Sequence, residues 1–175
     1  MSDRADVTYC YDGTFDGLLC CVFEAFDKKE TPVEIRDDDL TLFAVRHIET
    51  DGVKAERVLN GIRKKIGGRA FDNVRLTFLS GFAAKELAVL KYLRYGFRYG
   101  RKIYTAVANE AVAPIMAAVK SVYNEAHKMK EFVRFTDYGS SLVSVIEPTH
   151  NVLPLIADHF CDRLPQETFM IYDKG

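Results

Sequence analysis

Short runs of β-branched and aromatic residues stand towards both ends of this sequence, and a long block of helical periodicity lies between them. The strand-like runs fall at residues 6–11, 33–35, 42–45, 133–136, 142–146 and 169–172. Apolar residues at helical spacing mark residues 15–26, 53–66, 71–82, 83–95, 112–129 and 151–164. This order, β-α-β-β, several helices, then β-β-α-β, predicts an α+β fold in which a mostly antiparallel sheet carries helices packed on one side.

Local signals set the expected ends of these helices. Thr14 is the expected N-cap of the first helix, and Pro114 suits the first turn of the fifth. A chain of 175 residues is long enough to bury one core, and the sequence has no repeat, low-complexity tract or linker. We therefore predict a single domain over residues 1–175.

Targeting and cysteine patterns predict a cytoplasmic protein. No apolar run approaches the roughly 20 residues needed to span a bilayer. The first six residues, Met1 to Asp6, are acidic overall and lack the apolar segment of a signal peptide. The four cysteines are Cys10, Cys20, Cys21 and Cys161. None belongs to a Cys-x-x-Cys pair, so buried core thiols are favoured over zinc fingers and disulfides.

The net charge of −1 hides a strong separation of charge along the chain. Residues 1–53 hold 5 Lys/Arg and 13 Asp/Glu, residues 54–102 hold 13 and 3, and residues 103–175 hold 6 and 9. A basic segment of this kind favours a face or groove for an anionic partner. The alternative is that the acidic part, which includes residues 37–39, folds onto the basic part and neutralises it.

The basic segment ends in a stretch, residues 91–102, with five cations, three tyrosines and no acid. Helical spacing places its cations on one stripe and its tyrosines on a second, while Leu90, Leu93 and Phe97 face a core. Cations for phosphates and aromatic faces for bases are typical of a nucleic-acid surface. The alternative is a solvated helix whose tyrosines cover the domain edge. Gly96 and Gly100 indicate that the backbone comes close to a neighbouring helix or a ligand.

No catalytic constellation emerges from the residues alone. His159 shares a helical face with apolar residues and precedes Arg163 by one turn, a pair suited to a phosphate or carboxylate, although a histidine on such a face is commonly a core residue. No local spacing supports Glu125, His127 and His159 as a metal set, and no Walker lysine loop, dinucleotide glycine motif or nucleophile elbow occurs. We predict no metal and no cofactor.

Several segments together resemble a family of bacterial proteins described as probable DNA metabolism proteins, whose domain is otherwise known as domain of unknown function 4130. The resemblance is carried by residues 11–19, 79–80, 92–97, 125–129, 132–135, 147–148, 159–163 and 171–173. It therefore covers nearly the whole chain. It implies an accessory role in DNA repair or modification, because related domains are fused to a uracil-DNA-glycosylase-like domain or paired with a radical-SAM protein proposed to repair DNA.

The sequence departs from this family at several positions. Family members tend to have glycine where Glu131 stands, an aromatic residue where Ser144 stands and tryptophan where Phe169 stands. They also continue past the aspartate that matches Asp173 with an arginine-containing tail. This sequence stops two residues later, so we expect a site completed by that tail to be missing.

Three hypotheses of function follow. The first is a DNA-binding module whose basic, tyrosine-rich face uses Arg57, Arg63, Lys64, Lys65, Lys91, Arg94, Tyr95, Arg98, Tyr99, Arg101 and Lys102. The second is an enzyme acting on DNA or a nucleotide through a pocket formed by Glu125, His127, Arg134, His159 and Arg163. The third is a scaffold that holds the glycosylase-like or radical-SAM partner. No membrane association is expected.

Overall fold

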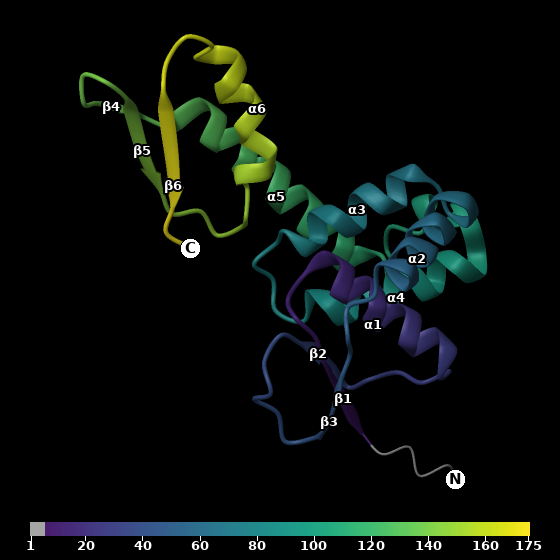
Figure 1. Ribbon diagram of the computed structural model, residues 1–175. Helices are drawn as coiled ribbons and strands as arrows, with labels where there is room; N and C mark the ends of the chain where they lie inside the picture. Colours follow the sequence, from purple (N-terminus) through teal and green to yellow (C-terminus); the bar gives the residue numbers. More distant parts are fainter. Residues whose placement is uncertain (1–5) are drawn as a thin grey trace.

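The computed structural model describes residues 6–175 (Figure 1). The prediction that the first six residues lack the features of a signal peptide falls, for residues 1–5, outside the described residues. The strands are β1 (Val7–Cys10), β2 (Glu34–Arg36), β3 (Ala44–His47), β4 (Thr136–Asp137), β5 (Leu142–Ile146) and β6 (Phe169–Asp173). The helices are α1 (Phe15–Asp27), α2 (Gly52–Lys65), α3 (Gly68–Phe78), α4 (Lys85–Tyr99), the 3-10 helix η1 (Gly100–Thr105), α5 (Ala113–Phe132) and α6 (Leu153–Arg163). The predicted order of elements is confirmed, with ends shifted by a few residues.

The prediction of a mostly antiparallel sheet with helices on one side is wrong. The strands form two separate three-stranded sheets, with orders β2-β1-β3 and β4-β5-β6. In the first sheet both neighbours of β1 run parallel to it. In the second, β4 and β5 form the predicted antiparallel hairpin, but β6 joins β5 in parallel.

Helical crossovers explain the parallel pairing. Between β1 and β2 the chain passes through α1, and between β5 and β6 it passes through α6. A helix of this length returns the chain to the end where the first strand began, so the next strand runs in the same direction. The segment between β2 and β3 is likewise not a hairpin turn, because β2 and β3 lie on opposite sides of β1.

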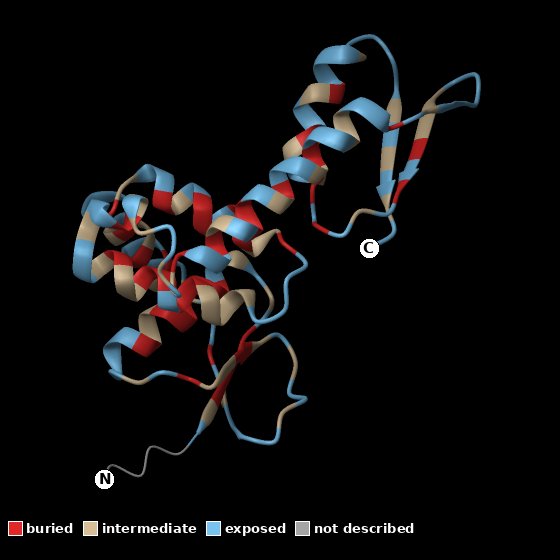
Figure 2. Ribbon diagram, turned by 180° about the vertical axis from the view of Figure 1, so that it is seen from behind, coloured by how far each residue is buried: buried red, intermediate tan, exposed pale blue. Residues whose placement is uncertain are grey.

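Two hydrophobic clusters hold the chain together. The larger one combines the buried sides of α1 to α5 with Tyr9, Tyr11, Ile35 and Ile48 from the first sheet and its flanks. The smaller one lies between the second sheet, α6 and the end of α5, with Phe160 at its centre. Buried residues accordingly concentrate among the helices and continue along α5 into the lobe formed by β4, β5, β6 and α6 (Figure 2).

Helix α5 belongs to both clusters. Ile115 and Val122 lie in the larger cluster, whereas Ala126, one turn beyond Val122, lies in the smaller one. At 20 residues the helix is about 30 Å long, which is enough to reach from the larger cluster to the smaller one. Pro114 stands in its first turn as predicted.

A buried histidine beside α5 links the lobe formed by β4, β5, β6 and α6 to the helices that precede α5. The His150 side chain is 4% exposed, its Nδ1 accepts a hydrogen bond from the Gly81 amide at 3.0 Å, and its Nε2 lies 2.8 Å from the Ser121 hydroxyl. The Glu125 carboxylate accepts from the amides of Thr149 at 2.9 Å and His150 at 2.8 Å. The segment before α6 is therefore tied both to α5 and to the turn that follows α3.

No helix within residues 6–175 combines the length and apolar character needed to cross a membrane.

Candidate nucleic-acid interface

Helix α4 carries most of the predicted interface, and its orientation is set by its apolar face. Val89, Leu90 and Leu93 are fully buried, as the helical spacing predicted for the two leucines. Tyr92 is buried with them at 1% exposure, and its hydroxyl accepts a hydrogen bond from the Asn73 side chain at 3.1 Å. Burial raises the pKa of Tyr92 above its ordinary value, and the hydrogen bond from Asn73 partly offsets this. Tyr92 therefore belongs to the core rather than to an exposed tyrosine stripe.

The two glycines of this region serve the packing. A Cβ on Gly96 would lie 2.6 Å from Cδ1 of Ile66 and 3.2 Å from Cδ1 of Ile103, so the close neighbour is the core. Gly100 has a φ of +59°, in the left-handed region that favours glycine, and its place at the end of α4 lets the chain turn into η1.

The outward side of α4 borders a groove of about 440 Å³. Its other wall is the turn that follows η1. The lining residues, which define the α4 groove, are Lys91, Arg94, Tyr95, Arg98, Tyr99, Asn109, Glu110 and Ala111. The structure thus places five of the eleven predicted interface residues around one hollow, and it adds three residues that the charge pattern did not indicate.

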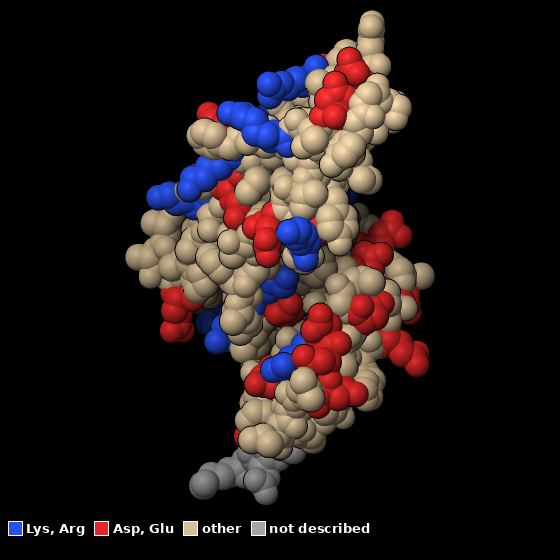
Figure 3. Space-filling model, turned by 90° about the vertical axis from the view of Figure 1, so that its left-hand side faces the viewer, with Lys and Arg blue, Asp and Glu red and all other residues tan. Residues whose placement is uncertain are grey.

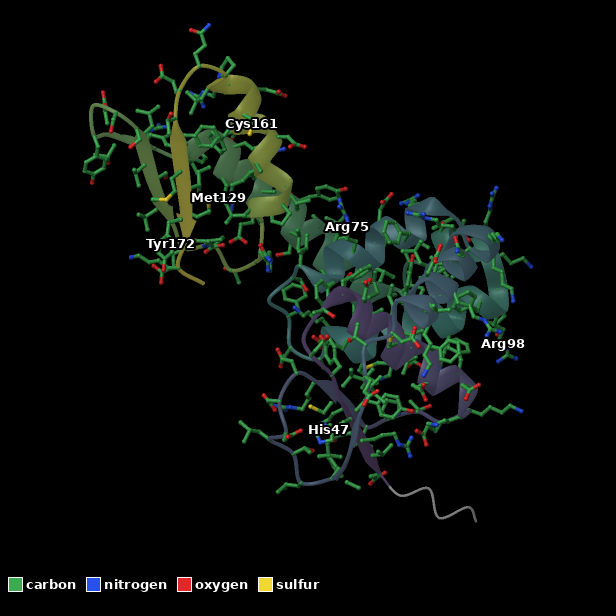
Figure 4. All side chains as sticks on the ribbon, in the orientation of Figure 1. His47, Arg75, Arg98, Met129, Cys161 and Tyr172 are labelled. Carbon is green, nitrogen blue, oxygen red and sulfur yellow. The ribbon has the colours of Figure 1, made fainter. Side chains whose placement is uncertain are left out.

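Within the α4 groove the aromatic and cationic groups are adjacent. The rings of Tyr95 and Tyr99 have centroids 4.6 Å apart and are inclined at 43°. The Arg98 guanidinium carbon lies 5.2 Å from the Tyr99 ring centroid, within the range of a cation–π contact. Tyr99 is 42% exposed, so one ring is open to solvent. Arg98 lies at the far side of the molecule from the C-terminal lobe (Figure 4).

Arg94 lines the groove but also has a structural role. Its guanidinium donates to the backbone carbonyls of Ala25, at 3.4 Å, and Glu30, and to the Thr31 hydroxyl. These groups belong to the end of α1 and the loop beyond it, so Arg94 fixes α4 against α1. Lys91 and Arg98 are both exposed and form no ion pair within residues 6–175, which leaves their charges available.

The remaining predicted cations lie outside the α4 groove. Arg57 and Lys65 border a second, largely apolar hollow of about 480 Å³ between α1, α2 and α4. The Arg57 guanidinium lies over the Phe23 ring, and that of Arg63 lies 4.7 Å from the Phe71 ring centroid. The other three, Lys64, Arg101 and Lys102, are exposed. The predicted set therefore covers two hollows and the surface beside them.

Acidic side chains neutralise the basic segment only locally. Of the basic segment, Lys54 pairs with Glu24 at 2.8 Å, whereas the pair of Arg46 and Glu30 lies wholly within residues 1–53. The acidic run at residues 37–39 serves its own surroundings, where Asp38 pairs with Arg36 at 2.9 Å. On the face drawn in Figure 3, acidic side chains gather at the lower part and Lys and Arg side chains form a row along the upper part.

The five residues predicted for an enzymatic pocket have separate surroundings. Glu125 binds the backbone at residues 149–150, and His127, on the exposed side of α5, lies 3.3 Å from Glu131. Arg134 borders a hollow of about 470 Å³ to which none of the other four contributes. Arg163 is exposed at the end of α6. No hydrogen bond or ion pair within the described chain joins any two of the five.

His159 differs from the satisfied core histidine that its position suggested. It is half-buried on α6, and its ring packs edge-on against Phe160 with centroids 5.0 Å apart. Its Nε2 atom is buried and has no hydrogen-bond partner among residues 6–175. Arg163, in contrast, is exposed.

The wall formed by Asn109 and Glu110 was missed at the level of sequence. Both residues fall in the segment after residue 102, where the net charge is negative, so charge counting did not join them to α4. Asn109 is a residue type that favours turns. Its side chain does cap this turn by accepting a hydrogen bond from the Ala111 amide at 2.9 Å.

Fold and groove define an α+β protein with a basic, tyrosine-bearing hollow on one helix. Comparison with known families then gives a match over residues 83–175 to a family described as a domain of unknown function (DUF4130), and the chain belongs to this family. The matching residues include the whole α4 groove. No curated protein and no solved structure matches the chain.

Proposed function

We propose that this chain is an accessory DNA-binding domain of DNA repair or modification, and that it holds single-stranded DNA in the α4 groove. One observation carries the proposal. Lys91 and Arg98, which form no ion pair within residues 6–175, line the same hollow as two neighbouring tyrosine rings, Tyr95 and Tyr99. Cationic side chains beside open aromatic rings are the arrangement by which proteins hold unpaired strands.

The two walls of the groove suit different parts of a nucleotide. Lys91 and Arg98 on α4 attract backbone phosphates, and the exposed ring of Tyr99 offers a surface on which a base stacks. Glu110 on the facing wall repels phosphate, but a carboxylate accepts hydrogen bonds from the amino groups of cytosine and adenine. A strand lying with its phosphates along α4 and its bases towards the turn satisfies both walls.

The family resemblance supports DNA as the nucleic acid, since the proteins that this chain resembles are described as acting in DNA metabolism. The predicted partners, a uracil-DNA-glycosylase-like domain and a radical-SAM protein, stay predictions. An enzyme acting through Glu125, His127, Arg134, His159 and Arg163 receives no comparable support, because these side chains do not share a hollow.

The test measures the affinity for a fluorescent single-stranded oligonucleotide as a function of salt. Each phosphate contact contributes about 0.7 to the slope of log K against log salt for single strands. The double variant Lys91→Glu/Arg98→Glu should therefore bind more weakly and lower the slope by about 1.4. Arg94 is left unchanged, because its replacement would also disturb α1.

The matched control is the double variant Arg75→Glu/Lys120→Glu, which reverses the charge of two exposed residues away from the groove, on α3 and α5. It makes the same change in net charge, so a general electrostatic effect would appear in both double variants. Binding that does not depend on salt, or that falls equally in the control, contradicts the proposal. Changing Tyr99 to leucine should weaken single-strand binding by the loss of stacking, roughly 1–3 kcal/mol, and should have less effect on duplex binding.

A further inference from the structure

Three potential metal ligands meet on the first sheet, far along the chain from the α4 groove. The Cys10 thiol, a carboxylate oxygen of Asp39 and a ring nitrogen of His47 all lie within 4.8 Å of one another. Cys10 is buried at 8% exposure, whereas Asp39 and His47 are exposed. We propose that these three side chains form a binding site for a zinc ion.

The sheet itself brings two of the ligands together. Cys10 ends β1 and His47 ends β3, and the two are directly paired in the parallel register of these strands. Paired residues on neighbouring strands place their side chains on the same face of a sheet, about 5 Å apart at the Cβ atoms. The relation between Cys10 and His47 is therefore fixed by backbone hydrogen bonds rather than by a mobile loop.

The third ligand arrives because the chain must cross β1. Since β2 and β3 flank β1 and run parallel, the segment between them passes over one face of the sheet. It is held there through Thr41, whose hydroxyl lies 3.0 Å from that of Thr8 on β1 and donates to Glu34 on β2 at 2.9 Å. This crossing carries Asp39 over the face that bears Cys10 and His47.

Two aspartates of this crossing, Asp38 and Asp39, make different contacts. Asp38 binds the Arg36 guanidinium at 2.9 and 3.0 Å and also accepts from the Leu40 amide, so it serves the loop. The Asp39 carboxylate instead faces His47, with 3.9 Å between its oxygen and Nε2. In a tetrahedral zinc site with bonds of about 2.0–2.3 Å, neighbouring ligand atoms are separated by roughly 3.3–3.6 Å. Small side-chain rotations close the remaining gap.

Sulfur, imidazole nitrogen and carboxylate oxygen are the ligand types that zinc takes in proteins. Zinc binding displaces the thiol proton of Cys10 to solvent and leaves a thiolate on the metal. Three protein ligands leave the fourth tetrahedral position to water, which is the arrangement of open rather than closed zinc sites. The proposal departs from the sequence-based prediction of no metal, which no observation yet decides. Cys10 and His47 are 37 residues apart, and only the strand pairing connects them.

The experiment is a titration of the full chain, without a histidine tag, with cobalt(II) and then zinc. A thiolate-to-cobalt absorption band in the near ultraviolet should appear and saturate at one metal per chain, and zinc should abolish it. The variant Cys10→Ser should lose the band, and His47→Gln and Asp39→Asn should weaken zinc binding by about 10-fold or more. His47 and Asp39 are exposed, so their variants keep the fold even if that of Cys10 does not.

The controls change the same residue types elsewhere on the surface. Cys161→Ser and His127→Gln alter an exposed thiol and an exposed histidine of the C-terminal half, and both should bind metal as the unmodified chain does. In Figure 4, His47 lies on the first sheet, whereas Cys161 lies on the lobe formed by β4, β5, β6 and α6. No saturable binding, or a band that survives Cys10→Ser and vanishes with Cys161→Ser, overturns the proposal.

Discussion

Replacing Glu125 by glutamine should destabilise the chain. The carboxylate of Glu125 accepts two backbone hydrogen bonds, from Thr149 at 2.9 Å and from His150 at 2.8 Å. Glutamine offers one oxygen and one NH2 group, so it keeps one of these bonds without its charge and sets a donor against a donor in the other.

The magnitude follows from the bonds that change. Hydrogen bonds to charged groups contribute about 1.5–3 kcal/mol, and the partial exposure of this site favours the lower end. We expect a loss of about 1–2 kcal/mol in the free energy of unfolding. For a chain of this size, this corresponds to a fall in Tm of roughly 2–8 °C.

Urea unfolding followed by circular dichroism gives the global value, and hydrogen exchange at the amides of Thr149 and His150 gives the local one. Glu131→Gln is the matched control, because the same change on the same helix touches only an exposed contact with His127. That control should stay within about 0.5 kcal/mol of the original chain. Equal stabilities for the two variants, with unchanged exchange at residues 149–150, would refute the structural role assigned to Glu125.

Two further predictions concern packing and thiol chemistry. Gly96→Ala should destabilise the chain by roughly 1 kcal/mol, because its Cβ would lie 2.6 Å from buried Ile66. Gly68→Ala should stabilise the chain by about 0.4–1 kcal/mol, because no atom lies within 4 Å of the added Cβ. A thermal unfolding experiment in which both variants shift Tm in the same direction contradicts this prediction. Burial, reinforced by the carboxylate of Asp39, raises the pKa of the Cys10 thiol to about 11. In metal-free protein, iodoacetamide should therefore modify exposed Cys161 near pH 8 and modify Cys10 only as the pH approaches 11. Peptide mass spectrometry measures both modifications. The folded chain then holds this proton more tightly than the unfolded chain, and the stability it contributes is lost as the pH rises towards about 11; faster labelling of Cys10 than of Cys161 at pH 8 would contradict the assignment.

The sequence predicted the elements well because their signals are local. Thr14 caps α1 by accepting from the Gly17 amide at 3.0 Å, as its residue type and position indicated. Strand partners are not local. Whether β2 pairs with β3 or each pairs with β1 depends on how α1 packs against the sheet, and no turn residue between them encodes that choice. The prediction of antiparallel pairing failed for this reason.

The candidate site shows the same division. Helical spacing correctly gathered Lys91, Arg94 and Arg98 on one side of α4. It could not show that Tyr92 lies on the buried side, because Tyr92 is matched by a polar partner, Asn73, from another helix. Nor could it show that Arg94 binds the end of α1. Contacts between helices decide which members of a basic stripe are free to bind, and those contacts join residues far apart in the sequence.

The larger hydrophobic cluster has a consequence for how this family can be studied. The family match begins at residue 83, yet α4 and the first half of α5 bury Leu90, Leu93 and Ile115 against helices that precede that residue. A boundary of sequence similarity therefore runs through the middle of a packed interior. A fragment cut at residue 83 would present the inner faces of α4 and α5 to water and would be prone to aggregate. Any relative that shares only the matched part needs a substitute for α1 to α3, supplied by its own chain or by another.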